Sequence, residues 1–108
     1  MRCFASLRRQ ADFARLRRHG RRISTKSLVI YRSDSLPGDG RALVGISVSK
    51  AIGKAVLRNK LRRRIAAILD DALAQRDAVR LLFVARPLAA NASFGDLRAE
   101  VTSALGPV

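Results

Sequence analysis

The pattern of apolar and polar positions is clearest over residues 55–73, where apolar side chains recur every three or four positions. This spacing gathers them on one side of a helix, because each residue turns an α-helix by about 100°. The apolar side holds Leu57, Leu61, Ile65, Ile68 and Leu69. The other side holds Asn59, Lys60, Arg62 and Arg63. We therefore expect a helix with one side on a core and a basic side facing outward.

Three shorter segments are typical of β-strands. Residues 28–31 (LVIY) and 42–48 (ALVGISV) flank the turn-forming segment 36–40 (LPGDG), so we expect the two strands to pair antiparallel. Residues 78–85 are mostly apolar, as in a strand covered on both faces, and Pro87 ends the segment. We expect this third strand at the centre of the sheet.

A short helix is expected near the start of the chain. Residues 10–18 place Phe13 and Leu16 on one side, and Gly20 is suited to end the helix. The other side of this helix is rich in arginine.

A closing helix is expected near the end of the chain. Ser93 and Asp96 have the spacing of a helix-capping pair. The apolar positions that follow at helical intervals are Phe94, Leu97, Val101 and Leu105. We expect Phe94, like Phe83 of the apolar strand, to lie in the core.

Positive charge is concentrated in two stretches of this chain of 108 residues, whose formal net charge is +14. Residues 1–22 carry eight arginines and one acid, and residues 41–64 carry eight cations and no acid. Basic helices are common solvated surfaces, but a run without acids has no favourable i,i+4 ion pair and accumulates repulsion. Arginine outnumbers lysine 18 to 4, and its planar guanidinium suits phosphates and bases. We therefore expect a nucleic acid as the partner.

The length of the chain fits one domain spanning residues 1–108, because domains of roughly 100 residues are common. Cys3 is the only cysteine, which fits a reducing cytoplasm and predicts no disulfide. No uncharged apolar run approaches the ~18 residues of a membrane span, and no secretory signal is apparent. The arginine-rich start would also suit an organellar transit peptide, but Phe13 and Leu16 fit a folded helix better. We expect a cytoplasmic protein without a membrane partner.

Residues for nuclease chemistry are scarce. A protein nuclease usually needs clustered carboxylates for metal ions or a pair of histidines. Asp70, Asp71 and Asp77 are close in sequence, but they fall on the late turns of the basic helix and in the loop after it, where they offset charge. His19 is the only histidine. We expect no catalytic residue and no metal site in the chain itself.

Gly53 and Lys54 precede the basic helix, but the segment lacks the glycine spacing and the Lys-Ser/Thr ending of a phosphate-binding loop. We expect no nucleotide or dinucleotide cofactor. The free N–H groups at the start of the helix can still donate hydrogen bonds to a phosphate of a nucleic-acid backbone, with Lys50 and Lys54 adding charge.

Phe13 and Tyr31 are aromatic residues beside basic ones, and two interpretations stay open for them. Each ring either packs in the core or stacks on an unpaired base.

Three blocks of sequence resemble, in the same order, the bacterial ribonuclease P protein component. The central block is GISVSK at 45–50, followed by GKAVLRNKLRRR at 53–64. The others are Asp12-Phe13 with Gly20, and ARP at 85–87. The resemblance extends over nearly the whole chain.

This resemblance implies an α+β fold, a single-domain α/β sandwich with the order α-β-β-β-α-β-α and a left-handed strand–helix–strand crossover, against the general rule. The residue pattern predicts three strands, so a further short strand before the basic helix is implied by the resemblance alone. The implied function is that of the noncatalytic protein subunit of a ribonucleoprotein endonuclease that matures the 5′ ends of tRNA. Its RNA subunit performs the hydrolysis with Mg²⁺.

The resemblance also implies two binding surfaces. The surface for the catalytic RNA subunit comprises Lys54, Arg58, Asn59, Lys60, Arg62 and Arg63. The cleft for the single-stranded 5′ leader of precursor tRNA comprises Phe13, Arg17, Tyr31, Lys50 and Arg86. Arg17 stands where the family often has another aromatic residue, and Ala51 stands where a second lysine often occurs. Arg17 is expected to stack through its guanidinium plane instead.

Two other functions fit the composition. A basic RNA-binding structural module, such as a ribosomal protein, would share the charge and size but needs no leader cleft. A DNA-binding protein fits less well, because no helix-turn-helix or dimer seam is apparent.

Overall fold

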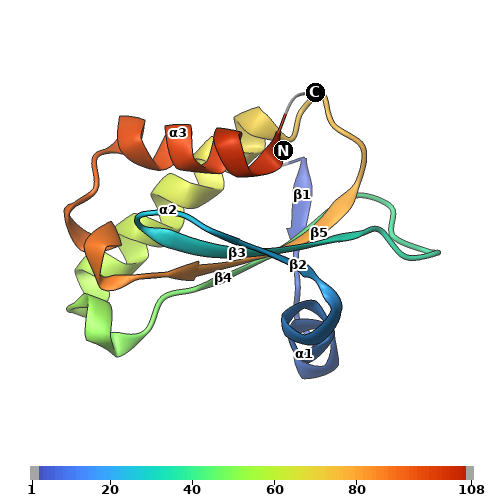
Figure 1. Ribbon diagram of the computed structural model, residues 1–108, viewed down its shortest axis with the longest axis horizontal. Coiled ribbons are helices and arrows are strands. Elements are labelled where there is room, and N and C mark those ends of the chain that lie inside the picture. The colour runs from blue at the N-terminus through green and yellow to red at the C-terminus, as the bar shows by residue number, and fades with distance from the viewer. Residues whose placement is uncertain (1–2, 107–108) are drawn as a thin grey trace.

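The protein, described here from a computed structural model over residues 3–106, is built on a five-stranded mixed sheet (Figure 1). The strand order is β1-β4-β5-β3-β2. The strands are β1 (Phe4–Ser6), β2 (Arg21–Ser24), β3 (Leu28–Asp34), β4 (Ala42–Ser47) and β5 (Val79–Ala85). β1, β4 and β5 run parallel, whereas β3 is antiparallel to both β5 and β2. The expected α+β sandwich is confirmed.

Three helices cover the two faces of the sheet. They are α1 (Gln10–His19), α2 (Ala55–Ala72) and α3 (Phe94–Leu105). Figure 1 shows α2 and α3 on one face and α1 alone on the other. All three helices begin and end within a few residues of the expected positions. No helix in residues 3–106 is long and apolar enough to cross a membrane.

Two hydrophobic clusters hold these layers together. The larger cluster lies between the sheet and α2 and α3, and it includes the apolar side of α2 at Leu61, Ile65 and Leu69. The smaller cluster lies under α1 and has Leu7, Leu16 and Leu82 as its buried members. α1 therefore rests on a few side chains, and it leaves part of this face of the sheet uncovered.

The strand pairing differs from the sequence prediction. β3 and β4 do not pair across the turn, because β5 lies between them and bonds to both. The hydrophobic effect explains this order: Leu81, Leu82 and Phe83 have no exposed surface, and only a central strand with both faces covered provides that. The central position expected for this strand is confirmed.

The short strand implied by the resemblance is confirmed as β2, and β1 is an additional strand of three residues. β4, α2 and β5 form a crossover between neighbouring parallel strands; its left hand stays a prediction. Ser93 caps α3 as expected, with its Oγ accepting the Asp96 N–H at 3.0 Å. The core position expected for Phe94 is wrong, because this first residue of α3 is 40% exposed.

α1 approaches the sheet closely at Gly45 of β4. A Cβ atom at this position would lie 2.6 Å from Cε1 of Phe13, well inside van der Waals contact. The position requires glycine for space, since its backbone φ is not positive. The ring of Phe13 thus rests directly on the backbone of β4.

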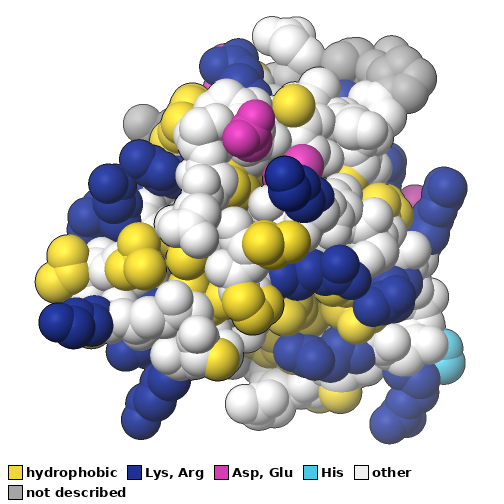
Figure 2. Space-filling model, turned by 60° about the vertical axis from the view of Figure 1, so that its left-hand side comes forward, with side chains coloured by type: hydrophobic (Ala, Val, Ile, Leu, Met, Phe, Trp, Pro, Cys, Tyr) yellow, Lys and Arg dark blue, Asp and Glu magenta, His cyan; other side chains and the backbone are white. Residues whose placement is uncertain are grey.

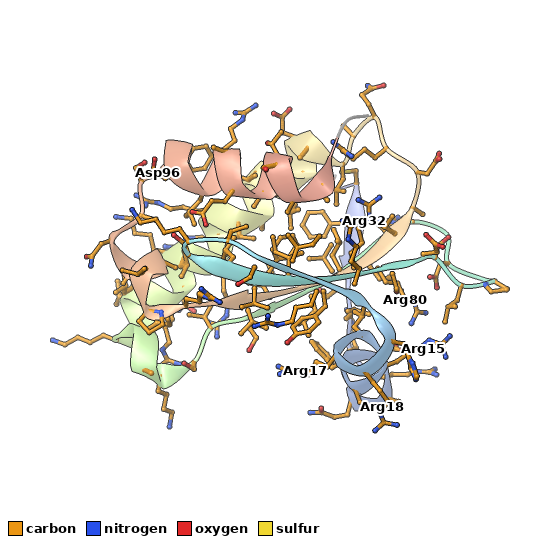
Figure 3. The ribbon with its side chains drawn as sticks, in the orientation of Figure 1. Arg15, Arg17, Arg18, Arg32, Arg80 and Asp96 are labelled. Carbon is orange, nitrogen blue, oxygen red and sulfur yellow. The ribbon has the colours of Figure 1, made fainter. Side chains whose placement is uncertain are left out.

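A buried arginine fixes α1 from the other side. Arg80 of β5 is 8% exposed and points toward α1, whereas Arg32 of β3 points toward α3 (Figure 3). Nη1 of Arg80 donates to Asp12 Oδ1 of α1 at 2.9 Å. Nε and Nη2 of Arg80 donate to Asp39 in the 36–40 turn at 2.9 and 3.0 Å. Three separate segments of the chain meet in this ion-pair network.

The Asp39 carboxylate should make stability depend on pH. Hydrogen bonds from Arg80 and then from the Leu36 N–H lower the pKa of Asp39 from 3.8 to about 2. Its contribution to the free energy of unfolding is present above pH 3.8 and is lost as the pH falls toward 2. We expect Asp39→Asn to flatten the decline of stability in this range, as measured by urea denaturation. Asp34→Asn, at an exposed carboxylate, is the control; a variant D39N with the wild-type slope would contradict the role of the network.

Candidate nucleic-acid interface

The basic side of α2 forms the first candidate surface, and the helix presents it to solvent. Asn59, Lys60 and Arg63 are exposed, and Arg62 is half-buried. Arg62 Nη1 donates to Asn59 Oδ1 at 2.9 Å, one turn earlier on the helix. Lys60 and Arg63 have no hydrogen bond or ion pair within residues 3–106, so their donors are available to a partner.

Arg58 lies at the margin between this surface and the protein interior. Its side chain is half-buried, and its Nε is enclosed without a hydrogen-bond partner in the described residues. An enclosed donor that lacks a partner costs about 1–3 kcal/mol. The Nε of Arg58 therefore has unmet hydrogen-bonding capacity in its enclosed position.

The start of α2 is open to an anion. Lys54 is the N-cap residue, no side chain caps the helix, and its first turn has no acid. Gly53 has φ of +150°, which L-residues with a side chain rarely adopt, and it turns the chain from the 3₁₀ helix at Lys50–Ile52 into α2. The unbonded N–H groups and the exposed Lys50 and Lys54 suit a phosphate.

The second candidate surface is the part of the sheet that α1 leaves uncovered. Tyr31 of β3 lies opposite Leu82 of β5, and both face α1. Phe13 and Tyr31 are each half-buried against the small cluster around Leu82. Each ring therefore packs along part of its surface and leaves the rest accessible, and stacking on a base stays a prediction.

The cationic residues expected for the leader cleft lie on α1 and just beyond the ends of two strands. Lys50 and Arg86 follow the carboxyl ends of the neighbouring parallel strands β4 and β5, so they share one edge of the sheet. Arg86 Nη2 donates to Ser24 Oγ of β2 at 2.6 Å. Arg17 points from α1 to the side where the helix leaves the sheet uncovered, as Figure 3 shows. Figure 2 shows Lys and Arg side chains on both flanks of the lower half of one face.

The strand register places two further residues, which the sequence did not indicate, on the face of the sheet that α1 covers. Arg22 of β2 lies opposite Tyr31, and Ser47 of β4 lies opposite Val84 of β5. Side chains that are directly opposite share a face of the sheet. Their position depends on long-range pairing, and no local motif marks it.

Within residues 3–106 no three His, Cys, Asp or Glu side chains lie together as a group that could hold a metal ion. Asp71 pairs with Arg98 of α3 at 2.6 Å, and Asp70 Oδ1 accepts the Cys3 N–H at 2.8 Å. These contacts agree with the structural role expected for the two aspartates.

Comparison with known proteins gives one consistent result. The chain matches the family described as Ribonuclease P over residues 1–108. It is 38% identical to the ribonuclease P protein component of Thermobifida fusca, over 94% of this chain and 74% of that protein. It is 40% identical to that of Acidothermus cellulolyticus, over 93% and 84%.

The fold gives the same result. The structure of the Staphylococcus aureus RNase P protein has a TM-score of 0.83 to this chain at 27% identity and covers 93% of this chain and 91% of its own. The RNase P protein from Thermotoga maritima shares the fold, with a TM-score of 0.79 at 22% identity. The chain therefore belongs to the family of ribonuclease P protein components, the protein subunits of a tRNA-processing endoribonuclease.

Proposed function

We propose that this protein binds the catalytic RNA subunit through the basic side of α2 and the 5′ leader of precursor tRNA through the cleft beside α1. The RNA subunit carries out the phosphodiester hydrolysis in the cytoplasm with its own Mg²⁺ ions. The observation that carries this proposal is that α2 and α1 lie on opposite faces of the sheet, so the two surfaces face different directions and adjoin where Lys50 and Lys54 precede α2 (Figure 1). One protein can then contact an RNA and its substrate together.

The chemistry of each surface fits its assigned partner. The unpaired cations of α2 suit the phosphates of a folded RNA, where affinity depends on charge. The cleft has two partly exposed aromatic rings and cationic margins, which suit an unpaired strand whose bases stack without regard to sequence. A structural RNA-binding module, such as a ribosomal protein, would need only the first of these surfaces.

The subunit assignment predicts the magnesium dependence of cleavage. The protein alone should leave precursor tRNA intact, whereas together with the RNA subunit it should lower the magnesium concentration needed for cleavage. The physical reason is that a net charge of +14 offsets repulsion between RNA and substrate. Magnesium titrations with and without protein measure this effect. Cleavage by RNA-free protein that disappears on substituting Asp70 or Asp71 would overturn the assignment.

The α2 surface should determine the salt dependence of binding to the RNA subunit. Lys60→Gln with Arg63→Gln removes two exposed cations and leaves the buried side of the helix intact. The log–log slope of affinity against salt should fall by about 1.4–1.8, since each phosphate contact contributes ~0.7–0.9. The charge-matched control is Lys26→Gln with Arg98→Gln, on the α3 side of the molecule. Equal slopes for the two double variants would place the RNA subunit elsewhere.

The cleft should act on the leader and leave assembly with the RNA subunit unchanged. Phe13→Leu and Tyr31→Leu keep an apolar side chain but remove the flat ring, and stacking contributes ~1–3 kcal/mol per base. Holoenzymes with either variant should lose affinity for precursor tRNA with a leader of several nucleotides, but not for one with a single-nucleotide leader. Phe94→Leu, at an exposed ring on α3, is the control. Equal losses on both substrates with lower melting temperatures would show that the rings are structural only.

A further inference from the structure

α1 carries more positive charge than the cleft uses. Arg15, Arg17 and Arg18 are all exposed, and they point in three directions around the helix (Figure 3). Arg17 points to the cleft side, Arg18 points away from the sheet, and Arg15 points to the side opposite the cleft. We define Arg15 and Arg18 as the outer α1 surface. Arg8 and Arg9, also exposed, precede the helix and add to the same positive field.

The charge of the outer α1 surface is not compensated within the protein. Asp12 is the only acid of α1, and its Oδ1 is bound to Arg80 in the sheet at 2.9 Å. Neither Arg15 nor Arg18 makes a hydrogen bond or an ion pair within residues 3–106. Like charges at this helical spacing repel each other and weaken the helix. An external anion can offset that cost, and the core gains nothing from these side chains.

The arrangement around the helix indicates which kind of anion fits. A rigid duplex would touch one side of a helix only about 10–12 Å across. Arg17, Arg18 and Arg15 instead follow one another around it from the cleft to the far side. A flexible single strand can follow such a path with successive phosphates, and arginine is well suited to bind phosphate.

We propose that the upstream part of the 5′ leader, beyond the nucleotides held in the cleft, leaves past Arg17 and wraps over the outer α1 surface. Arg18 and Arg15 bind its phosphates without reading its bases. This inference rests on the proposed function of the cleft. Leader length, rather than leader sequence, then determines how much of this surface is used.

The test compares precursor tRNAs with leaders of about 5 and about 15 nucleotides, a range typical of single-stranded binding sites. Binding of the wild-type holoenzyme is measured by fluorescence polarisation across a salt series, beside Arg15→Gln with Arg18→Gln and the control Lys26→Gln with Arg98→Gln. We expect the wild type and the control to bind the precursor with the long leader more tightly than the one with the short leader. The double variant at Arg15 and Arg18 should lose this gain, and its long-leader salt slope should fall by about 1.4. Its affinity for the short leader and for the RNA subunit should stay unchanged.

The possible failures are distinguishable. Suppose that the short leader improves binding over a single-nucleotide leader, but that the further gain from the long leader survives in the Arg15 and Arg18 variant. This inference is then wrong and the cleft proposal stands. A loss that is equal for both leaders, or a loss of RNA-subunit binding, would assign the outer α1 surface to the RNA subunit and also overturn the inference. If neither leader improves binding by the wild type over a single-nucleotide leader, both proposals fail. Circular dichroism spectra that match the wild type establish that both double variants are folded.

Discussion

The structure depends on β5 being buried on both faces. Leu81 and Phe83 face α2 and α3, whereas Leu82 faces α1, and none of the three has exposed surface. Because β5 bonds to β3 and β4, it fixes the register of the strands beside the proposed cleft. Burying such side chains contributes roughly 1.5–3 kcal/mol each. Both proposed binding surfaces are therefore positioned by a strand that contains none of the proposed contact residues.

The distribution of acids explains why a protein with so much positive charge still folds. Asp12 and Asp39 neutralise the buried Arg80, and Asp71 pairs with Arg98 on the side of α2 and α3. Glu100 accepts the Ser27 N–H at 2.7 Å. The acids thus stabilise the interior and the α3 side. The basic side of α2 and the outer α1 surface have none, so no acid nearby offsets the repulsion among their cations.

Local patterns predicted the helices well, since a 3.6-residue repeat such as that of α2 depends on neighbours in sequence. Long-range features were not predictable in this way. A turn between β3 and β4 suggested a hairpin, but the need to cover β5 on both faces outweighed that local preference. Arg80 interrupts an apolar strand, and its partners Asp12 and Asp39 lie 68 and 41 positions away. Phe94 continued an apolar repeat, yet the first residue of a helix has no preceding turn to cover it.

The proposed cleft rests on the family resemblance, and no local pattern in the sequence indicates it. Phe13, Tyr31 and Arg86 are far apart in sequence, and nothing in their local context distinguishes packing from stacking. The sheet register then added Arg22 and Ser47 to the same face.

β2 is an edge strand of the sheet, and its edge bears on whether free copies of the protein associate with one another. Edge strands expose unpaired backbone N–H and C=O groups on which another chain can assemble. Arg21 and Arg22 are both exposed on this edge, and the opposite edge, β1, has only three residues. Bringing two such edges together would align arginines of like charge. The same cations therefore protect the free protein against self-association and aggregation.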